Sequence, residues 1–250
     1  MPRFFINEEQ ISEGRAVIVG EDAHHIARSL RMAVGEEVIL CDRSGKEYSC
    51  IISGFLDDRE VYADVDKVCM SDAEPKYKLR LFQALPKGDK LDSIIQKAVE
   101  CGASEIFLFQ SEHCVVKIKK DSEDRKNERR QKIALSAAKQ CGRSIVPLVH
   151  EAVEFNSMLK VAGESDLVLF CYEGEGTLPI GKLLSEKLSE REDISSIAVI
   201  VGSEGGFSKG EVAAARAVGM IPVGLGKRIL RTETASSFAL ACIACITELN

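Results

Sequence analysis

Two glycine-rich loops near the C-terminus carry the residue types best suited to binding and chemistry. The first is Gly202-Ser-Glu-Gly-Gly-Phe, which follows a short apolar run at 197–201 that predicts a buried strand. It leads into Ser208 and Glu211, whose spacing is that of a capping box at the start of a helix. The second loop runs from Gly224 to Ala235, again ahead of a predicted helix. Backbone N–H groups at such strand-to-helix turns are open to a ligand.

The charged residues on these loops indicate which ligands the site could bind. Glu204 projects from the first loop, and Lys227, Arg228 and Arg231 project from the second. If the loops end neighbouring strands, they form one site with glycine backbone, one carboxylate and several bases. Such a site suits an adenosyl cofactor beside a polyanion. The alternative interpretation is a pair of tight turns whose charges are simply solvated.

Two other nucleotide-binding patterns fail at specific positions. The first loop reads G-x-x-G-G rather than the dinucleotide G-x-G-x-x-G, and residues 219–227 lack the acid that would bind a ribose. Residues 176–183 nearly match a Walker A loop, but Leu183 stands where the magnesium-binding hydroxyl is required. We therefore exclude nicotinamide, flavin and Walker-type sites.

The elements that position these loops belong to the second of two parts of the chain, which divides near a polar, proline-containing stretch at 70–76. Residues 1–70 predict strands at 15–19, 37–41, 47–55 and 60–68, with one helix from Glu21 to Met32. Short strands with a single helix indicate a small barrel. His24 and His25 are adjacent on that helix, a spacing that does not favour a shared metal ion.

Residues 77–250 alternate between strands and helices. Strands are predicted at 78–85, 105–109, 167–171, 197–201 and 221–223, and helices at 91–99, 121–141 and 233–249, among others. This order indicates a mostly parallel sheet covered on both faces, with ligands beyond the carboxyl ends of the strands. The last helix carries a seam of Phe238, Cys242, Cys245 and Leu249. That seam is expected to contact either another subunit or the interior of its own chain.

The composition is that of a soluble protein in a reducing compartment. The chain has 250 residues, 45% hydrophobic residues and a net charge of −6. No apolar run approaches the roughly 18 residues of a membrane span. The N-terminus does not resemble a signal peptide, and nine cysteines lack framework spacing, so we expect a cytoplasmic location. The C-x-x-C pair Cys242 and Cys245 lies late in a helix and is interpreted as packing.

One segment is strongly basic. Residues 117–143 carry ten Lys or Arg, Lys119 and Lys120 among them, against four Asp or Glu. Residues 1–70, by contrast, carry 8 Lys or Arg against 14 Asp or Glu. The basic segment is a candidate phosphate-facing patch.

The two loops resemble the signature loops of SPOUT methyltransferases. Upstream segments are similar to the RsmE type, the 16S ribosomal RNA uridine N3-methyltransferases. These segments are His24-His-Ile-Ala-Arg-Ser-Leu-Arg-Met32, Ile95-Gln-Lys-Ala-Val-Glu-Cys-Gly102, Ser111-Glu-His-Cys-Val-Val-Lys117 and Gln140-Cys-Gly-Arg-Ser-Ile-Val-Pro147. Ser203, His113 and Cys101 replace a common proline, arginine and leucine of that family.

The resemblance implies a fold, a cofactor and partners. The fold is a PUA-like RNA-binding barrel at 1–70 followed by an α/β, SPOUT-like methyltransferase domain at 77–250, a mostly parallel sheet with a trefoil knot. The cofactor is S-adenosylmethionine, with no metal. The partners are 16S rRNA or the assembled small ribosomal subunit, and a second copy of the chain. Alternatives are a non-catalytic RNA-binding protein of ribosome assembly and a SPOUT enzyme with another RNA target.

The resemblance also implies site residues. Cofactor contacts are expected at Leu169, Phe170, Tyr172, Gly202, Glu204, Gly205, Gly206, Leu225, Gly226, Ile229 and Leu230. RNA contacts are expected at Arg28, Arg31, Lys97, Lys117, Arg129, Arg130, Arg143 and Arg228. Because uridine N3 must lose a proton before it attacks a methyl group, Arg231 is expected to stabilise the anion or hold a phosphate. Glu204 is expected to act as a base or a cofactor contact, or only to order its loop.

Overall fold

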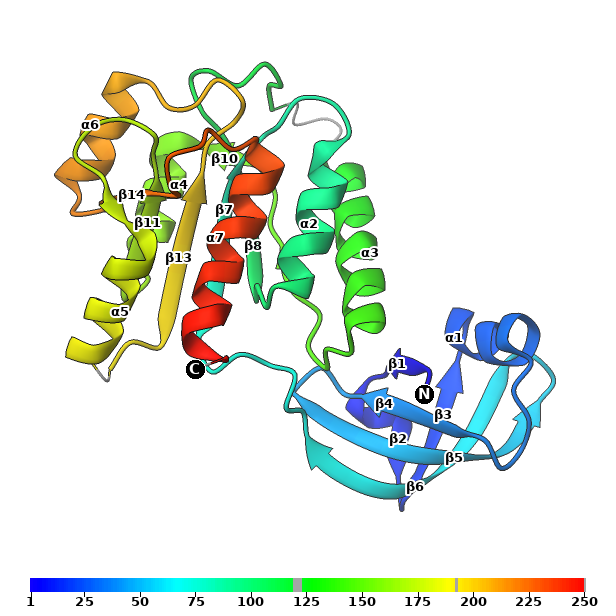
Figure 1. Ribbon diagram of the computed structural model, residues 1–250. Coiled ribbons are helices and arrows are strands. Elements are labelled where there is room, and N and C mark those ends of the chain that lie inside the picture. Colours follow the sequence, from blue (N-terminus) through cyan, green and yellow to red (C-terminus); the bar gives the residue numbers. More distant parts are fainter. Residues whose placement is uncertain (119–122, 192, 250) are drawn as a thin grey trace. The chain divides into compact units, whose positions relative to one another are not determined.

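The computed structural model describes residues 1–118, 123–191 and 193–249 and divides into two units (Figure 1). The N-terminal unit comprises Met1–Glu74 and Ala138–Val146, and the C-terminal unit comprises Pro75–Ala137 and Pro147–Asn250. The first boundary, between Glu74 and Pro75, lies within the polar stretch at 70–76. Residues 138–146 belong with the N-terminal unit, which the sequence did not predict.

The N-terminal unit is built on a curved sheet with strand order β1-β4-β5-β6-β3-β2. Its strands are β1 (Arg3–Phe5), β2 (Ile11–Ser12), β3 (Arg15–Val19), β4 (Glu37–Cys41), β5 (Lys46–Leu56) and β6 (Glu60–Met70), with a 3-10 turn at Glu8–Gln10. β1 pairs with β4 in parallel, and the other ladders are antiparallel. One face buries a core that includes Phe4, Ile18, Leu40 and Ile52.

The expected helix at 21–32 takes a different form. It starts as α1 (Glu21–His24), widens into a π-helical turn at His25–Leu30, and ends at Arg31, whose φ is 53°. The left-handed Arg31 closes the turn, and the Met32 N–H donates to the carbonyl of Ile26. Ala23 and Ile26 stay fully buried in this arrangement, so the core contact that the apolar spacing predicted is kept.

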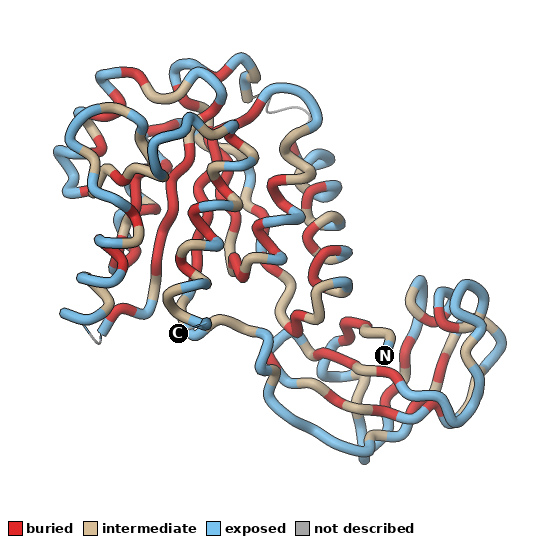
Figure 2. Tube along the Cα trace, in the orientation of Figure 1, coloured by how far each residue is buried: buried red, intermediate tan, exposed pale blue. Residues whose placement is uncertain are grey.

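The C-terminal unit contains a sheet with strand order β10-β8-β7-β13-β11-β14-β12, and β9 pairs with β8. Its strands are β7 (Lys78–Ala84), β8 (Glu105–Gln110), β9 (Leu148–Val149), β10 (Val153–Glu154), β11 (Leu167–Cys171), β12 (Leu178–Pro179), β13 (Ser196–Val201) and β14 (Ile221–Gly224). Each pairing between described strands of this sheet is parallel, which confirms the predicted sheet type. Buried residues follow the central strands (Figure 2).

Helices cover both faces of this sheet, as expected. They are α2 (Lys90–Glu100), α3 (Glu123–Cys141), α4 (Phe155–Ala162), α5 (Ile180–Glu190), α6 (Lys209–Ala217) and α7 (Thr232–Thr247). α7 packs on β13 between α2 and α5, and α4 and α6 lie behind the sheet in Figure 1. None of the helices in the described ranges is long and apolar enough to span a membrane.

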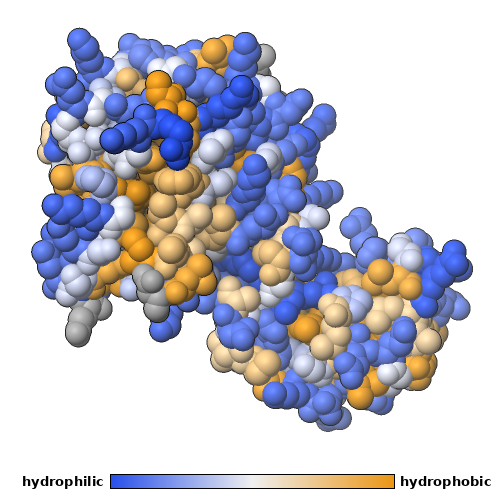
Figure 3. Space-filling model, in the orientation of Figure 1, coloured by the Kyte–Doolittle hydropathy of each residue, from blue (hydrophilic) through white to orange (hydrophobic). Residues whose placement is uncertain are grey.

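The last helix presents its seam outward. α7 buries Ser236, Ala239, Leu240 and Ile243 against its own unit. Phe238 is 39% exposed and Leu249 is 78% exposed, and Cys245 is exposed as well. Burial inside its own chain is therefore wrong for these three residues of the seam, whereas the fourth, Cys242, is half-buried. Apolar side chains gather over this outward face of α7 (Figure 3).

Candidate active site

Three neighbouring strands deliver their following loops to one cavity. β13, β11 and β14 are adjacent and in register, with Leu169 paired to both Val199 and Ile221. The cavity beyond their carboxyl ends has a volume of about 550 Å³. Its wall is formed by residues 171–173 and 177 after β11, 201–204, 206 and 207 after β13, 224–232 and 235 after β14, and Lys90 of α2. The two glycine loops thus share one site.

The first loop is held in shape by its neighbours. A Cβ atom at Gly202 would lie 3.1 Å from the ring of Phe207, so a larger residue would crowd that ring. Phe207 in turn packs on Phe170, with 4.3 Å between ring centroids. The predicted capping box is present: the Glu211 N–H donates to Ser208 Oγ at 3.2 Å, and the Ser208 N–H donates to Glu211 Oε2 at 2.9 Å. The loop therefore enters α6 with its backbone fixed.

The Glu204 carboxylate accepts hydrogen bonds from two residues at the N-terminus of α2. Lys90 Nζ lies 2.8 Å from Glu204 Oε1, and the Lys87 N–H donates to both carboxylate oxygens at 3.2 Å. Partial burial opposes ionisation, but the hydrogen bonds from Lys90 and from backbone N–H groups outweigh it and hold the pKa of Glu204 below its usual value. A carboxylate in this state is a weak base. The contacts favour a loop-ordering role for Glu204 over proton abstraction.

A buried polar network ties the start of α7 to the first loop. Thr232 Oγ1 donates to the carbonyl of Gly202 at 2.6 Å and accepts from Gln83 Nε2 at 2.9 Å. Ser236 Oγ donates to Gln83 Oε1 at 2.5 Å, and all three side chains are buried. None of these residues was predicted as functional. The polar Gln83 within the apolar strand β7 was the available signal, since buried polar groups require partners.

The second loop places unpaired cations at the cavity rim. Within the part of the chain that the structure describes, the side chains of Lys227, Arg228 and Arg231 form no hydrogen bond or ion pair, and all three are exposed. Gly226 has a φ of 106°, which favours glycine at this turn. Ile229 is 84% exposed between these charges. The rim can therefore receive an anion at low desolvation cost.

Most expected cofactor residues line the cavity, and three do not. Tyr172, Gly202, Glu204, Gly206, Leu225, Gly226, Ile229 and Leu230 are in the wall. Leu169 and Phe170 are fully buried beneath it, so they support the floor. Gly205 faces away, toward His113, whose Nδ1 lies 2.9 Å from the Gly205 carbonyl oxygen. The histidine that replaces the usual arginine thus contacts the first loop. Lys90, Glu173 and Thr177 are wall residues that the sequence did not single out.

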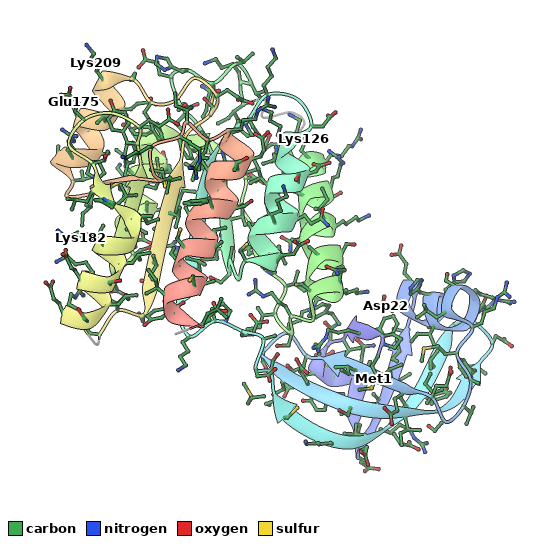
Figure 4. The ribbon with its side chains drawn as sticks, viewed as in Figure 1. Met1, Asp22, Lys126, Glu175, Lys182 and Lys209 are labelled. Carbon is green, nitrogen blue, oxygen red and sulfur yellow. The ribbon has the colours of Figure 1, made fainter. Side chains whose placement is uncertain are left out.

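The expected RNA contacts separate into exposed and buried side chains. Lys97 and Lys117 are exposed in the C-terminal unit, and Arg31 is exposed in the N-terminal unit. Arg28 is exposed and its Nε lies 3.1 Å from Asp58. Arg129 is exposed and pairs with Asp92 on α2. Lys126 also lies at the outer surface of α3 (Figure 4). Lys119 and Lys120 lie outside the described residues.

Two expected RNA contacts are buried ion pairs instead. Arg130 is 7% exposed and pairs with Glu123 on the same helix. Arg143 is 3% exposed, and its Nη2 lies 2.6 Å from Glu74 Oε2 within the N-terminal unit. The Glu74 carboxylate also accepts from the N–H groups of Ser144 and Ile145. Neither guanidinium is available to a phosphate in this structure, because each is enclosed with its carboxylate.

The chemistry of the wall fits an adenosyl cofactor. Backbone groups at both glycine turns are close to the cavity, and Leu225 and Leu230 supply an apolar surface for a base. Ser203 lines the cavity and has a buried hydroxyl with no hydrogen-bond partner among the described residues. Such an orphaned hydroxyl next to a cavity is a site at which a polar ligand can bind. Within the same ranges, no cluster of His, Cys, Asp and Glu could hold a metal ion.

Comparison with known proteins identifies the class. Residues 73–244 match the RNA methyltransferase domain family, and residues 18–66 match the RNA methyltransferase PUA domain family. The chain is 36% identical to the ribosomal RNA small subunit methyltransferase E of Bacillus subtilis, over 100% of this chain and 98% of that protein. The structure of a ribosomal RNA small subunit methyltransferase E from Neisseria gonorrhoeae bound to S-adenosylmethionine is also similar. It has a TM-score of 0.83 and 29% identity over 98% of each chain.

The fold and cavity therefore define an RNA methyltransferase with a PUA-like N-terminal domain. The chain belongs to the ribosomal RNA small subunit methyltransferase E family.

Proposed function

We propose that this protein uses S-adenosylmethionine to methylate N3 of a specific uridine in 16S rRNA. One observation carries the proposal: both glycine loops line a single cavity whose rim holds the exposed Arg231. The relative from Neisseria gonorrhoeae binds S-adenosylmethionine, and the relative from Bacillus subtilis is a small-subunit rRNA methyltransferase. Both support the same cofactor and substrate for this chain.

Different residues of the cavity wall would bind the cofactor and stabilise the reacting uracil. The glycine backbone of the two loops, Ser203, Leu225 and Leu230 would hold the cofactor. When bound, the cofactor supplies an electrophilic methyl group on a positively charged sulfur. Arg231 would donate hydrogen bonds to the uracil O2 or O4 edge and stabilise the N3 anion. Because Glu204 is a weak base here, we place the released N3 proton in solvent at the open rim.

RNA binding would use the exposed cations of both units. We retain Arg28, Arg31, Lys97, Lys117, Arg129 and Arg228 as phosphate contacts and leave out the buried Arg130 and Arg143. Contacts of this kind make affinity fall steeply with salt. The substrate would be 16S rRNA, either free or in the assembled small subunit.

We also propose that two copies of the chain pair through the outward face of α7. This face exposes four apolar side chains, Phe238, Ala241, Cys245 and Leu249. An exposed apolar patch of this kind is typical of a protein–protein interface. Light scattering of the purified protein would give twice the chain mass. A charged substitution such as Ala241→Glu would shift it toward the single-chain mass. The trefoil knot that the family resemblance implies stays a prediction, as does the dimer.

The function is tested with purified protein, S-adenosylmethionine and 16S rRNA. Arg231→Ala should lower kcat at least about 10²-fold, as loss of one transition-state donor does, with cofactor affinity within about threefold of the wild type. Arg191→Ala is the matched control, because Arg191 pairs with Asp193 at the far end of α5. Unchanged methylation by Arg231→Ala would remove this residue from the mechanism. Absence of cofactor binding would favour a non-catalytic RNA-binding role.

A further inference from the structure

We infer that Lys90 is a positioning residue that holds the two cofactor loops together at the cavity rim. The inference rests on the proposed cofactor site and assigns a role to a residue outside both loops. Lys90 is the first residue of α2 and lines the cavity. Its ammonium lies 2.8 Å from Glu204 Oε1 and 3.4 Å from Glu233 Oε2. One cation therefore bridges two carboxylates.

The two carboxylates belong to different loops. Glu204 lies in the turn after β13, and Glu233 lies near the end of the second loop, where it forms the first turn of α7. Lys90 thus joins the loop that follows β13 to the end of the loop that follows β14. Hydrogen bonding to Glu204, and the charge of both carboxylates, raises the pKa of Lys90, so it is charged throughout the range in which proteins are assayed.

Removing the ammonium would leave two carboxylates facing one another across the rim. Both carboxylates lie within 3.4 Å of the ammonium, so without it the two like charges would repel and push the first loop away from α7. The Lys87 N–H would still hold Glu204 near α2, so the loop would widen rather than unfold. The predicted consequence is a wider cavity that binds the cofactor with lower affinity.

A second contact, which is uncharged and more deeply buried than Lys90, also connects the two loops. Thr232 joins the same two segments through its bond to the Gly202 carbonyl, and it is buried with Gln83. The fold of the unit therefore does not depend on Lys90, whose side chain is 30% exposed. This separation predicts that loss of Lys90 affects the rim and cofactor binding much more than stability.

The test compares Lys90→Met, Lys90→Arg and Lys90→Met/Glu233→Gln with the wild-type protein. Lys160→Met is the matched control, because Lys160 is exposed on α4, outside the cavity wall. Calorimetric titration with S-adenosylmethionine should show about tenfold weaker binding for Lys90→Met at low salt, with the difference shrinking at high salt. Lys90→Arg should recover affinity to within about threefold. The thermal midpoint should change by less than about 2 °C.

The double variant separates positioning from direct contact. If Lys90 neutralises the two carboxylates, Glu233→Gln in the Lys90→Met background should recover most of the lost affinity. If Lys90 instead binds the cofactor directly, the double variant will bind no better than Lys90→Met, and the inference fails. It also fails if Lys90→Met binds like the wild type.

Hydrogen exchange in the unliganded protein makes the test independent of the cofactor. Amides of residues 202–207 should exchange faster in Lys90→Met than in the wild type or Lys160→Met. If the wild type does not bind S-adenosylmethionine, the proposed function fails, and exchange still decides whether Lys90 holds the loops. Unchanged exchange at 202–207 would overturn the inference.

Discussion

Thr232→Val removes one hydroxyl from the buried hydrogen-bond network that connects the two loops. Valine has nearly the same shape as threonine, so the packing of the start of α7 is retained. The Gly202 carbonyl loses its donor at 2.6 Å, and Gln83 Nε2 loses an acceptor at 2.9 Å. Gln83 Nε2 keeps its bond to the Ala84 carbonyl, so the main cost is the unsatisfied carbonyl of Gly202.

The size of the effect follows from burial. Thr232 is 4% exposed and Gln83 is 0% exposed, so water does not replace the lost partner without rearrangement. A buried polar group left unsatisfied costs about 1–3 kcal/mol. For a unit of this size, about 2 kcal/mol corresponds to a drop in the thermal midpoint of roughly 4–8 °C. Cofactor affinity should fall as well, by about tenfold if most of this cost appears at the first loop.

Thermal unfolding followed by circular dichroism, with calorimetric titration of S-adenosylmethionine, measures both effects. Thr234→Val is the matched control, because Thr234 is an exposed threonine in the first turn of the same helix. It should change stability by less than about 0.5 kcal/mol. If Thr232→Val unfolds at the wild-type temperature and binds the cofactor equally well, the network does not hold the loops as described.

Three further predictions concern groups whose surroundings differ from what their residue type suggests. Arg143→Met should destabilise the N-terminal unit by about 3 kcal/mol in a urea titration, because the largely buried Glu74 carboxylate loses its counter-charge and keeps only the N–H groups of Ser144 and Ile145, while cofactor affinity stays unchanged. The pKa of Glu204 is lowered in the folded state, so its stabilising contribution is complete above its unfolded pKa of roughly 4.3 and is lost as pH falls through the folded pKa. The stability difference between wild type and Glu204→Gln should therefore be constant from neutral pH down to about pH 5 and shrink only below it; a change near pH 7 would contradict this assignment. Cys171 is half-buried in the cavity wall, and desolvation there raises the pKa of its thiol to about 12, so little thiolate is present at pH 8; iodoacetamide should modify the exposed Cys245 and leave Cys171 intact, as peptide mass spectrometry can check.

The parts of the fold that could be predicted from sequence are those with a strong periodic signal. The apolar runs that became β11 and β13, and the capping box at Ser208, were located within a residue of their final bounds. The strands β9, β10 and β12 have two residues each, too few to show any periodicity. The membership of residues 138–146 in the N-terminal unit depends on Glu74, a long-range partner that no local pattern reveals.

The candidate site was predictable in outline for a similar reason. Glycine spacing indicated both loops, and parallel strand order then brought them to one cavity. Charge alone placed Arg130 and Arg143 among the RNA contacts, whereas the structure buries both with a carboxylate, because sequence composition does not reveal which cations meet a carboxylate inside the protein. Lys90 and Thr232 were missed because their function depends on distant partners.

The most direct test of the central claim is nucleoside mass spectrometry of small-subunit rRNA from cells that lack this protein. N3-methyluridine should be absent from that rRNA, return when the wild-type protein is supplied, and stay absent with Arg231→Ala. Persistence of N3-methyluridine at its normal level in the deletion strain would contradict the proposed function.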